Sequence, residues 1–388
     1  MVRAVSLDDD ARHELVELAG SHRLRVPRVL EGRQGPVIAL DGREVINLAS
    51  NDYLGLAGDP RLATAVKAAL DEDGIGAGAS RLVVGNHREH VRLESAVADW
   101  LRSEAVRSFN SGYAANVGVL TTVMRAGDVV FSDELNHASI IDGCRLSRAT
   151  VRIYPHRDTA ALARKLAQAG GARRRIVVTE SLFSMDGDLA DVGEIAQLCR
   201  AHDAALVVDE AHAIGVLGPE GRGLCAEHGV VPDILIGTFG KALGCFGAFA
   251  ATTRSIADLL WNRARTLVFS TGLPPVVAAA STAAVAIARS GEGDDRRRVL
   301  AGHARALRAA LPDARGAETS AIVPVVIGDD REVMRVTARL LEHGVFVQGI
   351  RPPTVPDGTA RLRIGLTAGH SDAQLAVAID ALRNAVRQ

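Results

Sequence analysis

Hydrophobic and polar positions alternate with different periods along the chain, and the first 55 residues show two of these patterns. Apolar residues recur at helical spacing between about 8 and 24, and two short apolar pieces, 36–40 and 45–49, lie on either side of Asp41-Gly42. An Asp-Gly pair between two apolar runs is typical of a β-hairpin turn. We therefore expect residues 1–55 to form a leading helix followed by a hairpin.

From about residue 60, short apolar runs alternate with stretches of helical periodicity. The clearest of these runs are 106–109, 128–133, 151–155, 175–180, 205–210, 234–238 and 247–252. Such nearly continuous apolar runs indicate strands that are buried on both faces, and their alternation with helices predicts a mostly parallel sheet. We expect residues 56–270 to form a large α/β domain around this sheet.

The last third of the chain has a different pattern. An Ala-rich helix is predicted over roughly 274–290, ending in the polar stretch SGEGDD, and the next element expected is the apolar run 321–328. A helix near 330–343, the runs 345–350 and 361–366, and a closing helix follow. This order predicts a smaller α+β domain over residues 271–388.

Composition and charge narrow the classes of function. The chain has 388 residues, 47% of them hydrophobic, and a formal net charge of -1, which gives no electrostatic reason to expect nucleic acid or an anionic membrane as partner. No apolar run is long enough to span a bilayer, and the acidic N-terminus does not resemble a signal peptide. The cysteines, Cys144, Cys199, Cys225 and Cys245, are far apart, as in a protein of a reducing cytosol. A cytoplasmic protein is expected.

Candidate chemistry follows the predicted strands. In an open parallel sheet, ligands bind outside the carboxyl ends of the strands. Asp209 closes one run with His212 three residues later, and Thr238 closes the next run with Lys241 three residues later. A carboxylate, an imidazole and a lysine at one sheet edge suit a pyridine-ring cofactor, because the carboxylate pairs with the ring nitrogen and the lysine forms an imine.

Each of these residues also has a plainer interpretation, since most lysines after a strand are solvated and most such aspartates cap a helix. Lys241, however, stands in the uncharged, Gly-rich stretch GTFGKALGCFGAF, where a surface lysine would be unusual. Two other motifs are set aside. The run GIGAGAS (74–80) follows no predicted strand, so it is not a dinucleotide loop, and Gly240-Lys241 lacks the glycine and Ser/Thr of a P-loop. His87 and His90 have no further ligands nearby in sequence, so no metal site is expected.

An ordered set of motifs resembles the α-oxoamine synthases. The motifs are SNDYLGL (50–56), GAGASR (76–81), SGYAAN (111–116), NHAS (136–139), ESLFSMDG (180–187), DEAH (209–212), TFGK (238–241), STGLPP (270–275) and RPPTVP (351–356). The similarity extends over nearly the whole chain from about residue 24. Members of that family are fold-type-I, pyridoxal 5′-phosphate (PLP)-dependent acyltransferases that condense an amino acid with an acyl thioester and release CO2.

The resemblance implies PLP as cofactor and assigns contacts to it. The expected positions are Gly112, Tyr113, His137, Ser184, Asp209, His212, Thr238, Lys241 and Thr271. Lys241 resembles the lysine that holds the cofactor and moves the substrate Cα proton, and His137 resembles the histidine that stacks on the ring, with a proton-donating role. Gly112 and Tyr113 would open a helix whose backbone N–H groups bind the phosphate. Thr271 resembles a residue that reaches the phosphate of a partner subunit, which implies a homodimer with shared sites.

The substrate side is carried by the RPPTVP segment and the GTARLR that follows it. These two segments resemble those of the α-oxoamine synthases that join L-alanine to a pimeloyl thioester in biotin biosynthesis. Arg351 then resembles an arginine that binds the amino-acid carboxylate, and Thr354, Asn51 and His137 would also contact substrate. Arg25 aligns with an arginine that meets the acyl substrate, while Arg23 and Arg28 remain alternatives for that role.

Three other functions remain open from the sequence. A sister α-oxoamine synthase would use glycine or serine in place of alanine. A PLP aminotransferase would need no acyl thioester, and a PLP-binding regulator would have no catalysis. The identity of the acyl carrier, CoA or a carrier protein, also stays open.

Overall fold

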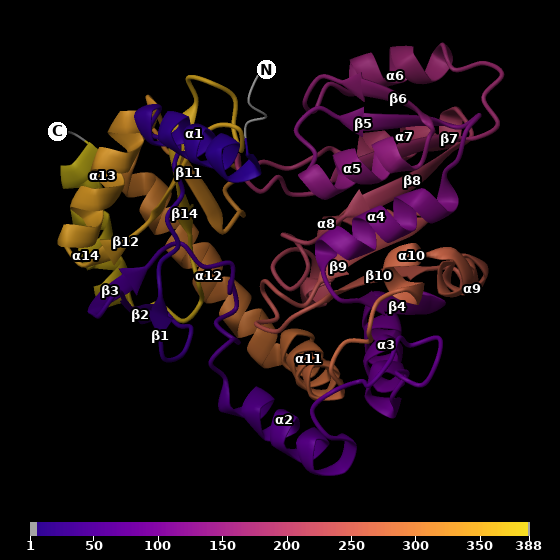
Figure 1. Cartoon of the computed structure of the whole chain (residues 1–388), viewed down its shortest axis with the longest axis horizontal. Helices are drawn as coiled ribbons and strands as arrows, with labels where there is room; N and C mark the ends of the chain where they lie inside the picture. Colours follow the sequence, from indigo (N-terminus) through magenta and orange to yellow (C-terminus); the bar gives the residue numbers. More distant parts are fainter. Residues whose placement is uncertain (1–5, 387–388) are drawn as a thin grey trace.

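A seven-stranded sheet occupies the middle of the chain (Figure 1). The computed structural model describes residues 6–386. In sheet order the strands are β4 (Ala105–Phe109), β10 (Ala248–Thr252), β9 (Ile234–Thr238), β8 (Ala204–Asp209), β7 (Arg175–Glu180), β5 (Val129–Asp133) and β6 (Thr150–Tyr154). The neighbours from β9 to β6 are parallel, and only β10 runs antiparallel to the strands beside it, so the predicted mostly parallel α/β sheet is confirmed.

The sheet is buried on both faces. On β7, Ile176 and Val178 pack in one hydrophobic cluster with residues of two helices, α4 (Gly112–Val123) and α5 (Ala138–Leu146). Val177 packs in another cluster with residues of α6 (Thr159–Ala167) and α7 (Val192–Ala201). Consecutive strand residues point to opposite faces, which explains why the runs are apolar throughout. The helices around this sheet are α4 (Gly112–Val123), α5 (Ala138–Leu146), α6 (Thr159–Ala167), α7 (Val192–Ala201), α8 (Leu224–Glu227), α9 (Arg254–Arg263) and α10 (Arg265–Val268), with a 3₁₀ turn, η1 (Pro219–Gly221).

The N-terminal segment forms the predicted helix and hairpin. These elements are α1 (Leu7–Gly20), β1 (Leu30–Glu31), β2 (Val37–Leu40) and β3 (Arg43–Asn47). Asp41 and Gly42 both have positive φ, 50° and 75°, as the tight turn between β2 and β3 requires. The fourth strand of this sheet, β12 (Val345–Phe346), comes from the far end of the chain and lies parallel to β3, so the two ends of the chain are joined in one sheet.

A second small sheet has the order β11 (Ile322–Gly328), β14 (Ala360–Gly365) and β13 (Gln348–Ile350). Its neighbouring helices are α13 (Asp330–Glu342) and α14 (Asp372–Val386). The apolar run 345–350, predicted as one strand, is divided here. Its first half pairs with β3 and its second half with β14, because the chain crosses from one small sheet to the other at Val347.

Helix α11 (Pro275–Ala288) packs against both α2 (Pro60–Asp73) and α3 (Arg88–Leu101), below the large sheet in Figure 1. Helix α12 (Gly291–Ala310) corrects the sequence analysis, which placed no helix between the SGEGDD stretch and residue 321. Acidic residues favour a helix N-terminus, and Glu292 and Asp294 pair with Arg296 and Arg297 one turn later. The polar stretch therefore begins a helix. None of the described helices is long and apolar enough to cross a membrane.

Candidate active site

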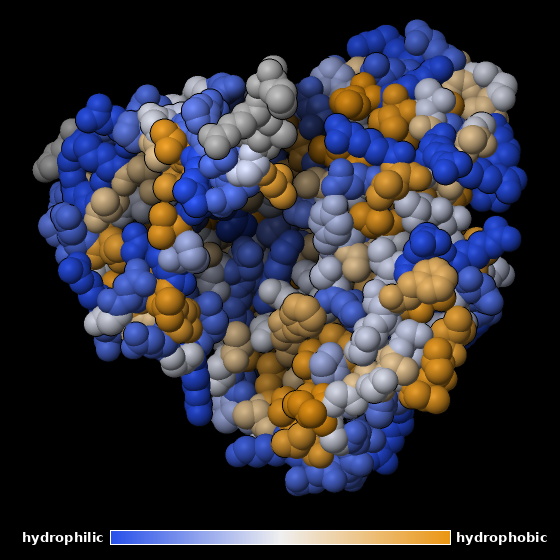
Figure 2. All heavy atoms as spheres, viewed as in Figure 1, coloured by the Kyte–Doolittle hydropathy of each residue, from blue (hydrophilic) through white to orange (hydrophobic). Residues whose placement is uncertain are grey.

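The carboxyl edge of the large sheet faces the two small sheets across a cavity of about 800 Å³. Figure 2 shows this face of the molecule hollowed between the two parts of the chain. One side, the sheet wall, consists of Asn136, His137, Ser184, Met185, His212 and Lys241. The other side, the outer wall, consists of Arg25, Ala49, Asn51, Gln348, Ile350, Thr354 and Arg363. Seven of the residues predicted from the sequence therefore line one cavity.

Lys241 lies in the turn that follows β9. Thr238, at the end of that strand, accepts a hydrogen bond from the Gly240 N–H (3.1 Å) and donates one to the Gly247 carbonyl (2.8 Å), which fixes the start of the turn. The side chain of Lys241 reaches the cavity while its amine is surrounded by protein. Burial lowers the pKa of Lys241, and the carboxylates of Asp209 and Glu180 offset part of that effect. A lysine in this setting can exchange a proton near neutral pH.

Asp209 ends β8 with its carboxylate oriented by two donors. Oδ2 accepts from the side-chain amide of Asn116 on α4 (2.7 Å), and Oδ1 accepts from the Ala211 N–H (2.8 Å). Asn116 Oδ1 is buried and has no hydrogen-bond partner among the described residues. Asn116 belongs to the SGYAAN motif, but nothing in its local pattern distinguishes it from an ordinary helix residue. The one indication in the sequence is its distance from Ser111, because a residue five positions after the helix cap lies about one turn into the helix.

His137 begins α5 and caps it. Its Nδ1 accepts from the Ser139 N–H (3.2 Å), and its backbone N–H donates to Glu180 Oε1 (2.6 Å) at the end of β7. Burial lowers the pKa of His137, which favours a neutral ring. Burial and the nearby Asp209 raise the pKa of Glu180. Glu180 was missed as a site residue, although it closes its strand just as Asp209 closes the next one.

A hydrogen-bond chain joins the sheet wall to the outer wall. Tyr53 Oη lies 2.7 Å from His212 Nδ1, and Arg363 Nη2 donates to Tyr53 Oη (3.3 Å) and to Asn51 Oδ1 (3.1 Å). Burial, with the nearby Lys241 and Arg363, lowers the pKa of His212 well below its usual value, so the ring is neutral. The single hydrogen of the Tyr53 hydroxyl can go to Asn51 Oδ1 (3.1 Å) or to His212 Nδ1, and donation to Nδ1 would put the proton of the neutral ring on Nε2.

Arg363 was not among the predicted site residues. It lies in β14, its Nε donates to the Ser184 carbonyl (2.6 Å), and it lines the cavity that contains Lys241. The available signal was the alternation in RLRIGL, which puts Arg361 and Arg363 on the same face of a strand that is otherwise apolar. Arg351, predicted for the amino-acid carboxylate, instead lines a neighbouring cavity and donates to the His22 carbonyl.

The start of α4 supplies free backbone donors. Ser111 caps the helix by accepting from the Ala114 N–H (3.1 Å), which leaves the N–H groups of the first turn, including Gly112 and Tyr113, without intrahelical partners. A Cβ on Gly112 would meet nothing within 4 Å, so there is open space at this helix end. The Tyr113 hydroxyl donates to Asp142.

Thr271 does not line the Lys241 cavity. It is exposed and forms an isolated bridge with Ser80, and its carbonyl accepts from the Asn110 side chain (2.9 Å). Its predicted contact with a partner subunit stays a prediction, as do the individual roles of the other site residues and the domain boundaries at 55 and 270.

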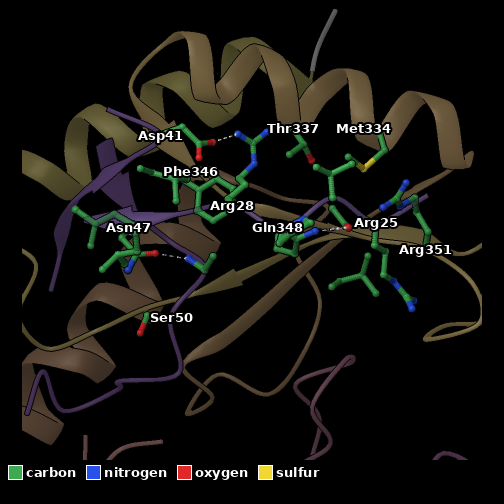
Figure 3. A pocket seen from close by; sticks show the side chains of 18 of the residues that line it. Arg25, Arg28, Asp41, Asn47, Ser50, Met334, Thr337, Phe346, Gln348 and Arg351 are labelled. Carbon is green, nitrogen blue, oxygen red and sulfur yellow. Dashed lines mark hydrogen bonds and ion pairs between the residues drawn. The ribbon is translucent and has the colours of Figure 1, made fainter. Parts of the chain in front are cut away.

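A second cavity, of about 720 Å³, adjoins the first and shares Arg25, Ala49, Gln348, Ile350 and Thr354 with it (Figure 3). The three arginines of the N-terminal segment differ there. Arg23 pairs with Asp330 and Asp357, and Arg28 pairs with Asp41, whereas Arg25 donates to the Thr354 hydroxyl (3.0 Å). Of the three alternatives left open by the sequence, the structure brings Arg25 to the boundary between the two cavities.

The groups around Lys241 fit PLP. An oriented carboxylate, a flat neutral imidazole, a lysine with lowered pKa and a helix N-terminus with open space are what a phosphorylated pyridine aldehyde requires. Within the described residues, no group of three or more His, Cys, Asp or Glu side chains is arranged to hold a metal ion.

The comparisons with known proteins agree with this fit. The family model described as aminotransferase class I and II matches residues 43–382. The serine palmitoyltransferase of Sphingomonas wittichii is 32% identical with a TM-score of 0.90, covering 97% of this chain and 96% of its own. The serine palmitoyltransferase of S. paucimobilis, solved with a bound PLP–myriocin aldimine, is 30% identical with a TM-score of 0.92. This match covers 98% of this chain and 97% of that one. The chain thus belongs to the class I and II aminotransferase family and has the fold-type-I architecture of PLP-dependent transferases.

The similarity to curated relatives is more specific. The 8-amino-7-oxononanoate synthase of Pelobacter propionicus is 47% identical over 380 residues, 97% of each chain. That of Geobacter metallireducens is 50% identical over 372 residues, 94% of each chain. The solved 8-amino-7-oxononanoate synthase of Francisella tularensis has a TM-score of 0.75 at 27% identity, covering 88% of this chain and 98% of its own. Within the larger family, the chain belongs to the 8-amino-7-oxononanoate synthases.

Proposed function

We propose that this enzyme catalyses the PLP-dependent, decarboxylative condensation of L-alanine with a pimeloyl thioester, giving 8-amino-7-oxononanoate, CO2 and the free thiol in biotin biosynthesis. The observation that carries the proposal is the single cavity lined by Lys241, His212, His137 and Arg363 in a chain with near 50% identity to synthases of that name. The acyl carrier is CoA or a carrier protein, and the enzyme would act in the cytoplasm.

When bound, PLP supplies an electron-poor ring that stabilises negative charge at the Cα of an amino acid attached to it. Lys241 would hold the cofactor through its amine. When not bonded to the cofactor, this amine would lie beside the amino acid, where its lowered pKa suits removal and return of the Cα proton. Asp209, kept in place by Asn116 and the Ala211 N–H, would pair with the ring nitrogen.

Other residues would orient the reactants. The N–H groups of Gly112 and Tyr113 at the start of α4 suit the phosphate, and Thr238 stabilises the turn that presents Lys241. Neutral His212 can donate from Nε2 to the ring oxygen, and Ser184 lies along the same edge. His137 would cover the ring and hold a proton near the new carbonyl.

For the amino-acid carboxylate, the geometry favours Arg363. It is buried, it lines the Lys241 cavity, and it lies beside Asn51. Guanidinium groups bind carboxylates through two parallel hydrogen bonds. Arg25 and Thr354, at the boundary between the cavities, are placed for the acyl donor.

A homodimer fits the surface. Several large apolar side chains are exposed, among them Ile75, Val83, Val84, Phe246 and Phe269, each more than half exposed. Figure 2 shows apolar side chains gathered on the lower part of the molecule, over α11 and its surroundings. Exposed apolar side chains in such number are typical of an interface, and Thr271 would then serve the site of the partner subunit.

The test is a reaction of the PLP-loaded enzyme with L-alanine and pimeloyl-CoA, following CO2 release and the product by mass spectrometry. Glycine and serine replace alanine in parallel reactions to separate the sister branches. Formation of pyridoxamine phosphate from alanine without CO2 release would instead indicate an aminotransferase.

A further inference from the structure

Two buried polar side chains outside the cavity connect Asp209 with His137. Helices α4 and α5 lie side by side over one face of the large sheet (Figure 1), and Asn116 of α4 meets Ser139 of α5 between them. The amide nitrogen of Asn116 donates one hydrogen to Asp209 Oδ2 (2.7 Å) and the other to Ser139 Oγ (3.0 Å). Ser139 Oγ in turn lies 2.7 Å from His137 Nδ1. Four side chains thus form one continuous chain of hydrogen bonds.

The direction of each hydrogen bond in this chain follows from its first member. An ionised carboxylate only accepts, so Asp209 keeps the amide nitrogen of Asn116 turned toward it. This orientation leaves the buried Asn116 Oδ1 without a partner within the described residues, whereas the reversed amide would bring two oxygens together. Because Ser139 Oγ accepts from Asn116, its own hydrogen is available for His137 Nδ1.

His137 Nδ1 has a second donor in the helix cap. The backbone N–H of Ser139 donates to the same nitrogen (3.2 Å). A ring nitrogen that accepts hydrogen bonds carries no proton, so the proton of the neutral ring is on Nε2. The residues that the structure describes give Nε2 no hydrogen-bond partner, and the ring lines the Lys241 cavity, so this N–H is available to a ligand there.

The charges around His137 act on it in opposite directions. Burial lowers the pKa of His137, Asp209 raises it, and Lys241 lowers it. Hydrogen bonds donated to Nδ1 exist only in the neutral form of the ring, so they favour that form over the imidazolium. The titratable and charged groups near the ring are Glu134, Glu180, Asp209, His212 and Lys241 on the side of the large sheet, and Arg25 and Arg363 across the cavity.

We propose that Asn116 and Ser139 are positioning residues that hold the ring of His137 in its neutral form with the proton on Nε2. His137 then offers a hydrogen-bond donor to the cavity without adding a positive charge beside Lys241 and Arg363. The part of this donor in catalysis rests on the proposed function, in which the proton lies near the new carbonyl. The hydrogen-bond chain itself does not depend on the reaction.

The test measures how tightly His137 binds a second proton, in the PLP-loaded enzyme and again after removal of the cofactor. Two-bond 1H–15N spectra of 15N-histidine-labelled protein distinguish the two neutral tautomers from the imidazolium, and His137→Asn assigns the signal. We expect the Nε2–H tautomer in the wild type. Ser139→Ala should keep that tautomer through the backbone N–H but bind the second proton about 3- to 10-fold more tightly. Ser139→Cys, a weaker donor of similar shape, should fall between the two.

Asn116→Leu tests the chain beyond Ser139. Alone, it should change the proton affinity of His137 in the same direction as Ser139→Ala but by a smaller factor. Combined with Ser139→Ala it should add nothing, because the path from Asn116 to His137 is then already broken. The control is Ser281→Ala, which removes a fully buried hydroxyl on α11 that donates to the Val277 carbonyl (2.8 Å) and should leave His137 unchanged.

The rate of the acyl step gives a second measurement. In the PLP-loaded enzyme, Ser139→Ala should lower kcat with alanine and pimeloyl-CoA about three- to tenfold. Cα hydrogen exchange of alanine without an acyl donor should change by less than about twofold, because the new carbonyl is not formed in that reaction. Equal losses in both reactions would indicate a purely structural role and overturn the proposal.

Two spectroscopic results would also overturn it. An Nδ1–H tautomer in the wild type would contradict the direction of the chain. A proton affinity in Ser139→Ala no different from that in Ser281→Ala would mean that the hydroxyl does not act on His137. Failure of the proposed function would look different, because the wild type would release no CO2 from alanine and pimeloyl-CoA while the spectra still gave the Nε2–H tautomer.

Discussion

The two walls of the Lys241 cavity are built in different ways. Every residue of the sheet wall follows the end of a strand of the large sheet, so the parallel strands of that sheet determine its position. The outer wall brings together residues 25, 49–51, 348–354 and 363, from opposite ends of the chain. Under the proposed function, the sheet wall would supply the residues for cofactor chemistry and the outer wall those that recognise substrates.

The largest effect should come from the sheet wall. Lys241→Ala removes the amine that we propose anchors the cofactor and moves the Cα proton, so turnover should fall by at least about 10³-fold. The measurement is CO2 release from alanine and pimeloyl-CoA, with thermal unfolding to check the fold. Lys67→Ala, an exposed lysine on α2, serves as control. A Lys241→Ala enzyme that retained a tenth of the activity would break the distinction between the walls.

On the outer wall, Arg363→Gln should affect the amino acid most. Hydrogen bonds to charged groups contribute about 1.5–3 kcal/mol, so kcat/KM for alanine should fall by about 10- to 100-fold. Cα hydrogen exchange of alanine, measured without an acyl donor, should fall with it. If the KM for alanine were unchanged while the KM for pimeloyl-CoA rose, Arg363 would be assigned to the acyl donor instead.

The sheet wall is also held by an ion cluster whose strength depends on pH. His156 lies between Asp133 (2.9 Å) and Asp188 (3.0 Å), and its ring packs edge-on against Phe183, next to Ser184. Burial of the ring lowers its pKa, but the hydrogen bonds to the two carboxylates raise it to about 9 overall. A histidine with raised pKa stabilises the folded state fully below about pH 6.5, and this contribution is lost as pH rises through 9.

We therefore expect the wild type to lose about 1–2 kcal/mol of unfolding free energy between pH 6.5 and 9. In His156→Gln this loss should be absent, because the variant has no proton to lose there. Urea denaturation at a series of pH values measures it. Parallel pH profiles for the two proteins would show that the cluster does not stabilise the sheet wall.

The smallest effect concerns the contact that joins the walls. Tyr53→Phe removes the hydroxyl that lies 2.7 Å from His212 Nδ1, which should lower kcat/KM about two- to tenfold, as expected for loss of one hydrogen bond. The low-pH limb of the kcat profile should shift, because His212 would no longer have Tyr53 on Nδ1. An unchanged rate and profile would mean that the walls act independently.

The sequence predicted the positions of candidate residues where position follows from the order of strands and turns. Asp209, His212, Thr238 and Lys241 could be found because each stands at or just after the end of a buried run, and strand ends of a parallel sheet meet at one edge. Arg363 could not be found in this way, because its position depends on how β14 packs against the loop that contains Ser184. The start of α12 was not predicted, because its polar residues show little of the apolar pattern expected for a helix. Charge pairs within the helix and packing against the rest of the protein stabilise it instead.

The division of residues 345–350 between two sheets has a consequence for how the substrates meet. β12 belongs to the sheet of the N-terminal segment, β13 pairs with the strand that contains Arg363, and Gln348 and Ile350 line both cavities. A shift of this short segment on binding of one substrate would alter the binding surface of the other. By thermodynamic reciprocity, alanine and the acyl donor would then change each other's affinity by the same factor, which is a measurable coupling free energy.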